Sequence, residues 1–170
     1  MATATEVSAG RLGAGDTRVI GLVSAAHFVS HLYGLLLPPV FALIQSDSGL
    51  SYQELAAVLA SYNLVSALLQ APTGFLVDRL GASRLLIAGL LLGSAAVAVA
   101  ALIPTYWALV ICFGVAGLGN TVYHPSDYAI LSHAVAPKRI GQAFSIHTFS
   151  GLLGFAAAPP LMLICARFWG

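Results

Sequence analysis

The sequence predicts an all-α membrane protein, a bundle of about five transmembrane helices. Of its 170 residues, 59% are hydrophobic and 8% are charged, whereas about 25% of the residues in a soluble domain are charged. The mean hydropathy is +0.91. Several apolar stretches reach the roughly 20 residues that a helix needs to cross a bilayer. We therefore expect the lipid bilayer to surround most of the chain, and the net charge of +1 does not indicate nucleic acid as a partner.

The boundaries of the predicted helices follow from polar breaks between the apolar stretches. The first two are separated by the polar residues 45–49, and Ser51 and Glu54 then have the spacing of a capping box. Pro104 ends the third, and the basic turn 137–139 separates the last two. A cytoplasmic amino-terminal tail, 1–18, thus precedes a membrane unit, 19–170, with predicted helices at about 19–44, 51–77, 84–103, 105–133 and 141–166.

Basic residues occur in alternate connections between these helices. They precede the first helix, join the second to the third, and join the fourth to the fifth: Arg11 and Arg18, Arg79 and Arg84, Lys138 and Arg139. The two opposite connections contain no lysine or arginine. Because positively charged short loops remain in the cytoplasm, this pattern predicts a cytoplasmic amino terminus in a bacterial inner membrane.

Glycines recur within the predicted helices at spacings of three or four residues. The pairs are Gly89 and Gly93, Gly114 and Gly117, and Gly151 and Gly154. Residues at these spacings share a helix face, and small residues there let the backbones of neighbouring membrane helices approach closely. We interpret these glycines as packing positions.

The connection after the second helix carries the most specific motif. It reads Gly74-Phe-Leu-Val-Asp78-Arg79-Leu-Gly81-Ala-Ser-Arg84. This run resembles the signature loop of the major facilitator superfamily, Gly-x-x-x-Asp-Arg-x-Gly followed by basic residues, which implies a conformational-switch loop. Gly74 permits close approach of helices, Asp78 can pair with arginine or cap a helix, and Gly81 allows a tight reversal. This chain differs from the family pattern in having a single basic residue, Arg84, after the turn.

The fourth predicted helix adds a second resemblance. Its run Gly117-Leu-Gly119-Asn120-Thr-Val-Tyr-His124-Pro125 is similar to the fosmidomycin-resistance type of transporter within the superfamily. Many members carry arginine where this chain has Phe113, so the proton-coupling role of that arginine is not transferred. The superfamily has twelve helices in two halves. The resemblance therefore implies part of an amino-terminal half, a fragment whose partners would include the missing carboxy-terminal helices.

Polar residues inside the predicted helices are candidates for a substrate or proton path. An ionisable group in hydrocarbon costs about 2.5 kcal/mol or more, so it usually faces a cavity or a partner. At 1.5 Å per residue, His31 and Asn63 lie roughly 18 and 16 Å from the ends of their helices, near mid-bilayer. The candidates are His27, His31, Asn63, Asn120, His124, Asp127 and His147. They could instead hydrogen-bond neighbouring helices and fix the packing, and the sequence leaves both interpretations open.

The resemblance and these residues predict a secondary active transporter of a small solute that works by alternating access. Titratable groups and the lack of a nucleotide-binding motif favour protons as the coupling ion. One alternative is a small non-transporting membrane assembly protein. Another is a membrane metalloenzyme, since His27 and His31 share a helix face, but they have no adjacent third ligand in the sequence. We expect no enzymatic activity, no cofactor and no metal.

Overall fold

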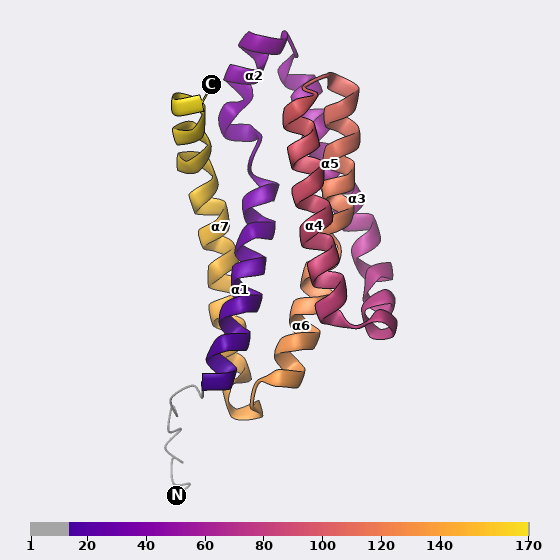
Figure 1. Ribbon diagram of the computed structural model, residues 1–170, viewed down its shortest axis with the longest axis vertical. Coiled ribbons are helices and arrows are strands. Elements are labelled where there is room, and N and C mark those ends of the chain that lie inside the picture. Colours follow the sequence, from indigo (N-terminus) through magenta and orange to yellow (C-terminus); the bar gives the residue numbers. More distant parts are fainter. Residues whose placement is uncertain (1–13, 170) are drawn as a thin grey trace, which may run out of the picture.

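The protein is a bundle of long helices, with no strand among the residues that the computed structural model describes, 14–169 (Figure 1). Its α-helices are α1 (Ala14–Gly34), α2 (Phe41–Ser48), α3 (Tyr52–Leu80), α4 (Ala82–Leu102), α5 (Tyr106–Asn120), α6 (Tyr123–Ala134) and α7 (Ile140–Trp169). Two short 3-10 helices are η1 (Pro38–Val40) and η2 (Pro137–Arg139). Five helical stretches are long and apolar enough to cross a membrane, and they confirm the predicted fold class. They are Gly15–Ser48, Tyr52–Leu80, Ala82–Leu102, Tyr106–Ala134 and Pro137–Phe168.

The start of α1 lies within the segment that the sequence assigns to a tail. Residues 14–18 are helical, and Asp16 in the first turn accepts a hydrogen bond of 2.8 Å from Arg139 of η2. This ion pair ties the start of α1 to the connection before α7. The rest of the expected tail, 1–13, lies outside the described residues.

Two of the five membrane stretches are interrupted where the sequence predicts single helices. In the first, 19–44, α1 ends before the proline pair that begins η1, and α2 follows. In the fourth predicted helix, 105–133, the break falls at residues 121–122, between α5 and α6. Proline has no backbone N–H, so Pro125 offers no donor to the carbonyl four residues before it. Each break redirects the chain inside one membrane crossing.

The helix ends follow the predicted local chemistry at two places. The hydroxyl of Ser51 accepts from the Glu54 backbone N–H at 3.3 Å, and the Glu54 carboxylate accepts from the Ser51 N–H at 2.8 Å, so the predicted capping box is confirmed. At the α3–α4 turn, Gly81 has φ +93, a conformation that side-chain-bearing residues rarely adopt. The tight reversal expected at this glycine is therefore present.

Glycines set the contacts between the main helix pairs, which are α3 with α5, α4 with α5, and α1 with α7. A Cβ at Gly117 would overlap the Tyr62 carbonyl oxygen of α3, and one at Gly119 would lie 2.7 Å from the Gly89 oxygen of α4. A Cβ at Gly154 would overlap the Phe28 carbonyl oxygen of α1. These helices therefore touch backbone to backbone, as predicted from the glycine spacing.

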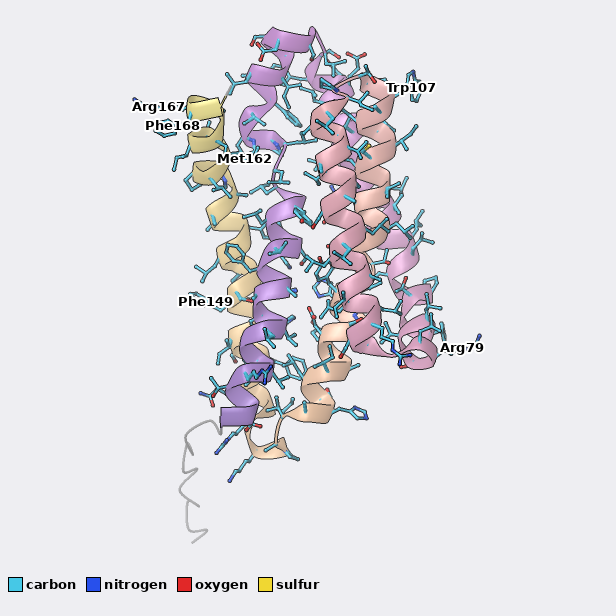
Figure 2. The ribbon with its side chains drawn as sticks, in the orientation of Figure 1. Arg79, Trp107, Phe149, Met162, Arg167 and Phe168 are labelled. Atoms are coloured by element: carbon cyan, nitrogen blue, oxygen red, sulfur yellow. The ribbon has the colours of Figure 1, made fainter. Side chains whose placement is uncertain are left out.

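The outer surface of the bundle is apolar along its length. Large hydrophobic side chains point outward, among them Leu102, 81% exposed, and Phe75, 74% exposed. Figure 2 shows Phe149 directed away from α7, with Trp107 and Arg79 at opposite ends of the bundle. The α3–α4 turn, η2 and the start of α1 lie at the same end, which carries the described lysine and arginine residues except Arg167, whereas α2, the α4–α5 turn and the end of α7 lie at the other (Figure 1). The predicted alternation of the basic connections is thus present in the structure.

Candidate functional site

Four histidines and one aspartate from three helices meet inside the bundle. His27 and His31 come from α1, His124 and Asp127 from α6, and His147 from α7. Asp127 is the centre of this group: its Oδ2 lies 3.4 Å from His27 Nδ1 and 3.8 Å from His147 Nε2. We refer to these five residues as the histidine–aspartate cluster.

The imidazole rings of the cluster contact one another directly. His27 stacks on His147 with ring centroids 3.8 Å apart and an interplanar angle of 29°. The rings of His31 and His124 pack edge-on against the ring of His27, with centroid distances of 4.4 Å and 5.1 Å respectively. At these distances two imidazolium cations would repel each other strongly. The arrangement therefore favours a cluster that holds few positive charges at once, near one carboxylate.

Three residues of the cluster are buried, His31 and His124 are half-buried, and most polar atoms of the cluster make no hydrogen bond within the described residues. Asp127 is 0% exposed, His147 1% and His27 3%. Within the part of the chain that the structure describes, neither Asp127 carboxylate oxygen makes a hydrogen bond, nor does Nδ1 of any of the four histidines. Buried polar groups are normally hydrogen-bonded, and those that are not call for an explanation. The contacts of Asp127 with His27 and His147 also join α6 to α1 and α7, so both interpretations of the sequence, a path and helix packing, stay open.

The cluster lies closer to the basic end of the bundle than to the other end. His147 follows Ile140, the first residue of α7, by about two helical turns, roughly 10 Å at 1.5 Å per residue. His27 follows Ala14, the first residue of α1, by roughly 20 Å on the same measure. Asp127 is completely buried at this depth rather than exposed at the end of its helix.

The two asparagines predicted with this group lie elsewhere. The Asn120 amide donates to Ser66 Oγ at 3.3 Å, which joins α5 to α3. Asn63 is exposed on α3, and its amide donates to the Leu59 carbonyl of its own helix at 3.0 Å. The structure thus brings together five of the seven predicted path residues, and both asparagines make their hydrogen bonds elsewhere.

A glycine that the sequence marks only for packing also makes room for the cluster. A Cβ at Gly151 on α7 would lie 2.7 Å from His27 Nε2 and 3.1 Å from His31 Cδ2. The ring of His27 can therefore stack on His147 only because residue 151 has no side chain. Sequence reasoning missed this role, and the signal available to it was the position of Gly151 one helical turn after His147.

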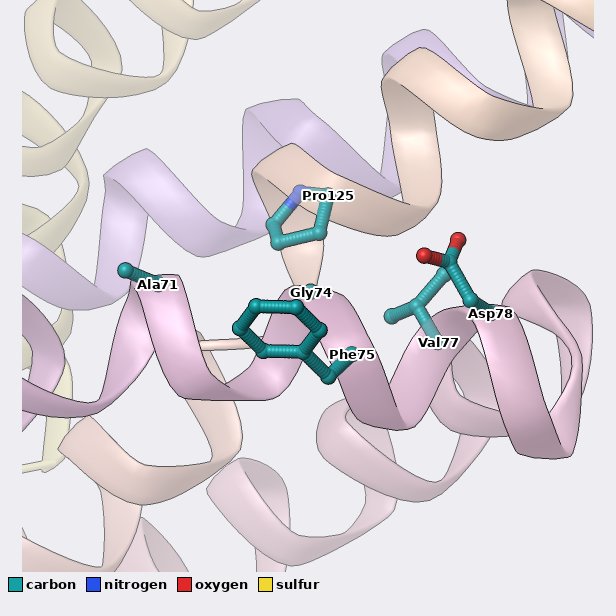
Figure 3. Close-up of a pocket in the computed structure, with 6 residues that line it drawn as sticks. All are labelled: Ala71, Gly74, Phe75, Val77, Asp78 and Pro125. Carbon is teal, nitrogen blue, oxygen red and sulfur yellow. The ribbon is translucent and has the colours of Figure 1, made fainter.

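The predicted switch loop surrounds two surface pockets. The larger, about 710 Å³, is lined by Asp78, Arg79, Gly81 and Arg84 together with the carboxy-terminal end of α6. The smaller, about 290 Å³, lies between Gly74, Asp78 and Pro125 (Figure 3). A Cβ at Gly74 would meet no atom within 4 Å in the described structure, so this glycine borders a pocket rather than a close helix contact. Pro125 directly follows His124, so α6 connects the loop to the cluster.

Comparison with known proteins gives the family. The model of the Major Facilitator Superfamily matches residues 23–170. The chain is 24% identical to the fosmidomycin resistance protein of Escherichia coli (strain K12) over 152 residues, which cover 89% of the chain and 37% of that relative. It is 30% identical to a multidrug resistance protein B homolog of Mycobacterium tuberculosis (strain ATCC 25618 / H37Rv) over 164 residues, or 94% of the chain and 30% of the relative.

A third relative is an uncharacterized MFS-type transporter of Bacillus subtilis (strain 168), 24% identical over 141 residues, which cover 83% of the chain and 34% of the relative. The chain thus spans about a third of the length of these relatives. The family match and the five apolar helical stretches establish an integral, multi-pass membrane protein. The resemblance first indicated by the loop after the second membrane stretch is confirmed: the chain belongs to the Major Facilitator Superfamily.

Proposed function

We propose that this chain is the amino-terminal part of a secondary active transporter, which moves a small solute across a bacterial inner membrane by alternating access. The observation that carries this proposal is the buried histidine–aspartate cluster, whose polar atoms lack partners in the described structure. Unpaired polar groups in a membrane bundle are expensive and typically belong to a solute or ion path. Family membership supports the same conclusion, because transport is the activity named for several of the relatives.

The proposed path runs along the cluster and continues past the two asparagines. His27, His31, His124, Asp127 and His147 would form its polar centre, and Asn120 and Asn63 would extend it toward α3. Asn63 is exposed in this structure, which leaves its amide available to groups outside the described chain. The opposite wall would come from further helices of the same transporter, since the relatives are about three times as long as this chain.

In the proposed orientation, the basic end of the bundle and the amino terminus face the cytoplasm. Arg79, Arg84 and Lys138 are exposed at this end, and lysine and arginine in short loops are retained on the cytoplasmic side. The cluster then lies in the cytoplasmic half of the path. Rocking of the transporter halves would change the pockets between the switch loop and α6, and Pro125 would transmit that movement toward His124.

Protons are the proposed coupling ion. The cluster combines imidazoles with a carboxylate, and both kinds of side chain can take up and release a proton. The test is transport into or out of inverted membrane vesicles that contain the product of the complete open reading frame. An imposed pH gradient should drive solute movement, and a protonophore should abolish it. Movement that follows a sodium gradient instead would reject proton coupling while leaving transport intact.

Asp127→Asn is the variant that tests the site. It keeps the shape of the side chain and removes its charge, so we expect transport to fall at least tenfold while the amount of protein in the membrane stays unchanged. Asp47→Asn is the matched control, because Asp47 is exposed in α2 at the opposite end of the bundle. Full transport in Asp127→Asn would remove the carboxylate from the mechanism. A wild-type protein that moves none of a broad panel of solutes and drugs would favour the non-transporting assembly protein.

A further inference from the structure

The imidazoles of the cluster are arranged like the ligands of a metal ion. One ligand atom each from His27, His124 and His147 lie within 4.8 Å of one another. Ligand atoms around a tetrahedral zinc ion, with Zn–N distances of 2.0–2.1 Å, are separated by about 3.3 Å. Binding of the ion would require rotation of the side chains to close that difference. The three ligands come from three helices, α1, α6 and α7, so the sequence-adjacent pair His27 and His31 is not the relevant grouping.

Asp127 lies beside these three imidazoles, outside the set of ligand atoms that lie within 4.8 Å of one another, and adds a carboxylate. Its Oδ2 lies 3.4 Å from His27 Nδ1 and 3.8 Å from His147 Nε2, and both of its oxygens are buried without a hydrogen bond in the described structure. An isolated carboxylate inside a membrane bundle is costly, and a divalent cation would compensate its charge. The same cation would accept lone pairs from imidazole nitrogens that have no donor nearby.

The ligand set selects among metal ions. Three imidazoles and one carboxylate suit zinc, cobalt, nickel or copper, whereas magnesium and calcium require six or more oxygen ligands. We propose that His27, His124 and His147 form a binding site for a divalent transition-metal ion such as Zn²⁺, with the Asp127 carboxylate beside them compensating its charge. The site uses residues of the proposed path, but metal binding can be measured without transport.

Gly151 supports the site from the side of α7. Any side chain at this position would press on His27, since a Cβ alone would lie 2.7 Å from its Nε2. Phe155 on the same helix contacts His31 edge-on at 4.3 Å and encloses the cluster on that side. His27 and His147 are buried and His124 is half-buried, so the site is partly shielded from bulk solvent.

The proposal is tested by equilibrium dialysis of Zn²⁺ against the detergent-purified product of the complete open reading frame, prepared with an affinity tag that contains no histidine. Co²⁺ serves as a second probe, because a tetrahedral nitrogen–oxygen site gives it strong visible absorption. We expect saturable binding of about one equivalent, unaffected by excess Mg²⁺. His27→Gln and His147→Gln should each weaken Zn²⁺ binding at least tenfold.

The matched control is His133→Gln, because His133 is the one histidine outside the cluster and is exposed on α6. It should bind Zn²⁺ as the wild type does. Helical circular dichroism and a single size-exclusion peak establish that each variant is folded. The proposal is overturned if folded wild-type protein shows no saturable Zn²⁺ binding, or if His27→Gln and His147→Gln bind as tightly as His133→Gln. Since no solute is present, failure of transport would leave this result unaffected.

Discussion

The helices α3, α4 and α5 and the helices α1, α6 and α7 form two regions that treat buried polar groups differently. In the first, the hydroxyls of Ser61 and Ser66 donate across the helix interface to the carbonyls of Val110 and Gly117, at 3.0 Å in each case. In the second, the atoms of the histidine–aspartate cluster are buried without such partners in the described residues. Satisfied polar groups stabilise packing, whereas unsatisfied ones retain their capacity to bind something else.

The apolar packing of the two regions differs as well. Around α3, α4 and α5 a continuous core of Val58, Tyr62, Phe113 and their neighbours fills the space between the helices. Where α1 faces α7 near His27, imidazole rings fill the space between the helices instead of apolar side chains. The glycine at this contact, Gly151, lies against the His27 ring and not against the backbone of α1. The second region also has an apolar core, around Ile20, Leu131 and Ala143, so the two regions differ where the cluster replaces apolar side chains. Three comparisons of substitutions test this difference.

The largest effect is expected for Gly117→Ala, which adds a methyl group against the Tyr62 carbonyl in the first region. Backbone cannot move aside as a side-chain tip can, so we expect a loss of about 1–3 kcal/mol in stability. The measurement is the melting temperature of the detergent-solubilised protein. Gly114→Ala, on the same helix, is the control, because its Cβ would meet only a Val65 methyl group at 4.0 Å. Equal melting temperatures for the two variants would show that α3 and α5 do not depend on this contact.

Gly151→Ala should have a smaller effect on stability but a clear effect on the site. The added Cβ would meet the His27 ring, which can rotate, so we expect a stability change of about 1 kcal/mol or less. The displaced ring would lose its stacking on His147, and Zn²⁺ binding and transport should both fall. Gly141→Ala is the control on α7, because a Cβ there meets nothing within 4 Å. If Zn²⁺ binding and transport remain unchanged in Gly151→Ala, the cluster does not depend on the absence of a side chain at residue 151.

The smallest effect compares one serine from each region. Ser66→Ala removes two hydrogen bonds between α3 and α5, to the Gly117 carbonyl and from the Asn120 amide, and should lower stability by about 0.6 kcal/mol for each, a typical value for such bonds in membranes. Ser126→Ala should leave stability unchanged or slightly raised, because the buried Ser126 hydroxyl makes no hydrogen bond in the described structure. The difference is measured from paired thermal unfolding curves. If Ser126→Ala lowered stability more than Ser66→Ala, hydrogen bonds of buried hydroxyls would contribute more to the region of α1, α6 and α7 than to the region of α3, α4 and α5.

Local chemistry made several features of this fold predictable. The length and apolar character of the stretches predicted the five membrane crossings, and the spacing of Ser51 and Glu54 predicted the capping box. The interruptions within the first and fourth crossings were not predicted, although Pro38 and Pro125 were visible in the sequence. Proline occurs inside membrane helices without ending them, as Pro159 does in α7, because neighbouring groups can satisfy the freed carbonyl. Whether a given proline breaks its helix therefore depends on its surroundings.

The candidate site shows the same limit. The sequence identified each of the five cluster residues, because an ionisable group in an apolar helix is conspicuous by composition. It could not separate them from Asn63 and Asn120, and it paired His27 with His31 as the possible metal ligands. The pairing of His27 with His147 joins residues 120 positions apart, and no local spacing encodes it.

The sequence by itself determined that this chain enters a membrane, how often it crosses, and which ends carry the positive charge, because these follow from hydropathy and charge summed along the chain. Only the tertiary structure decided which polar side chains meet and which are satisfied. That outcome depends on how closely α1, α6 and α7 approach, which is set by glycine contacts between helices and by the break before Pro125. Distances between residues on different helices are properties of the packing, and packing is a cooperative result of all the helices together.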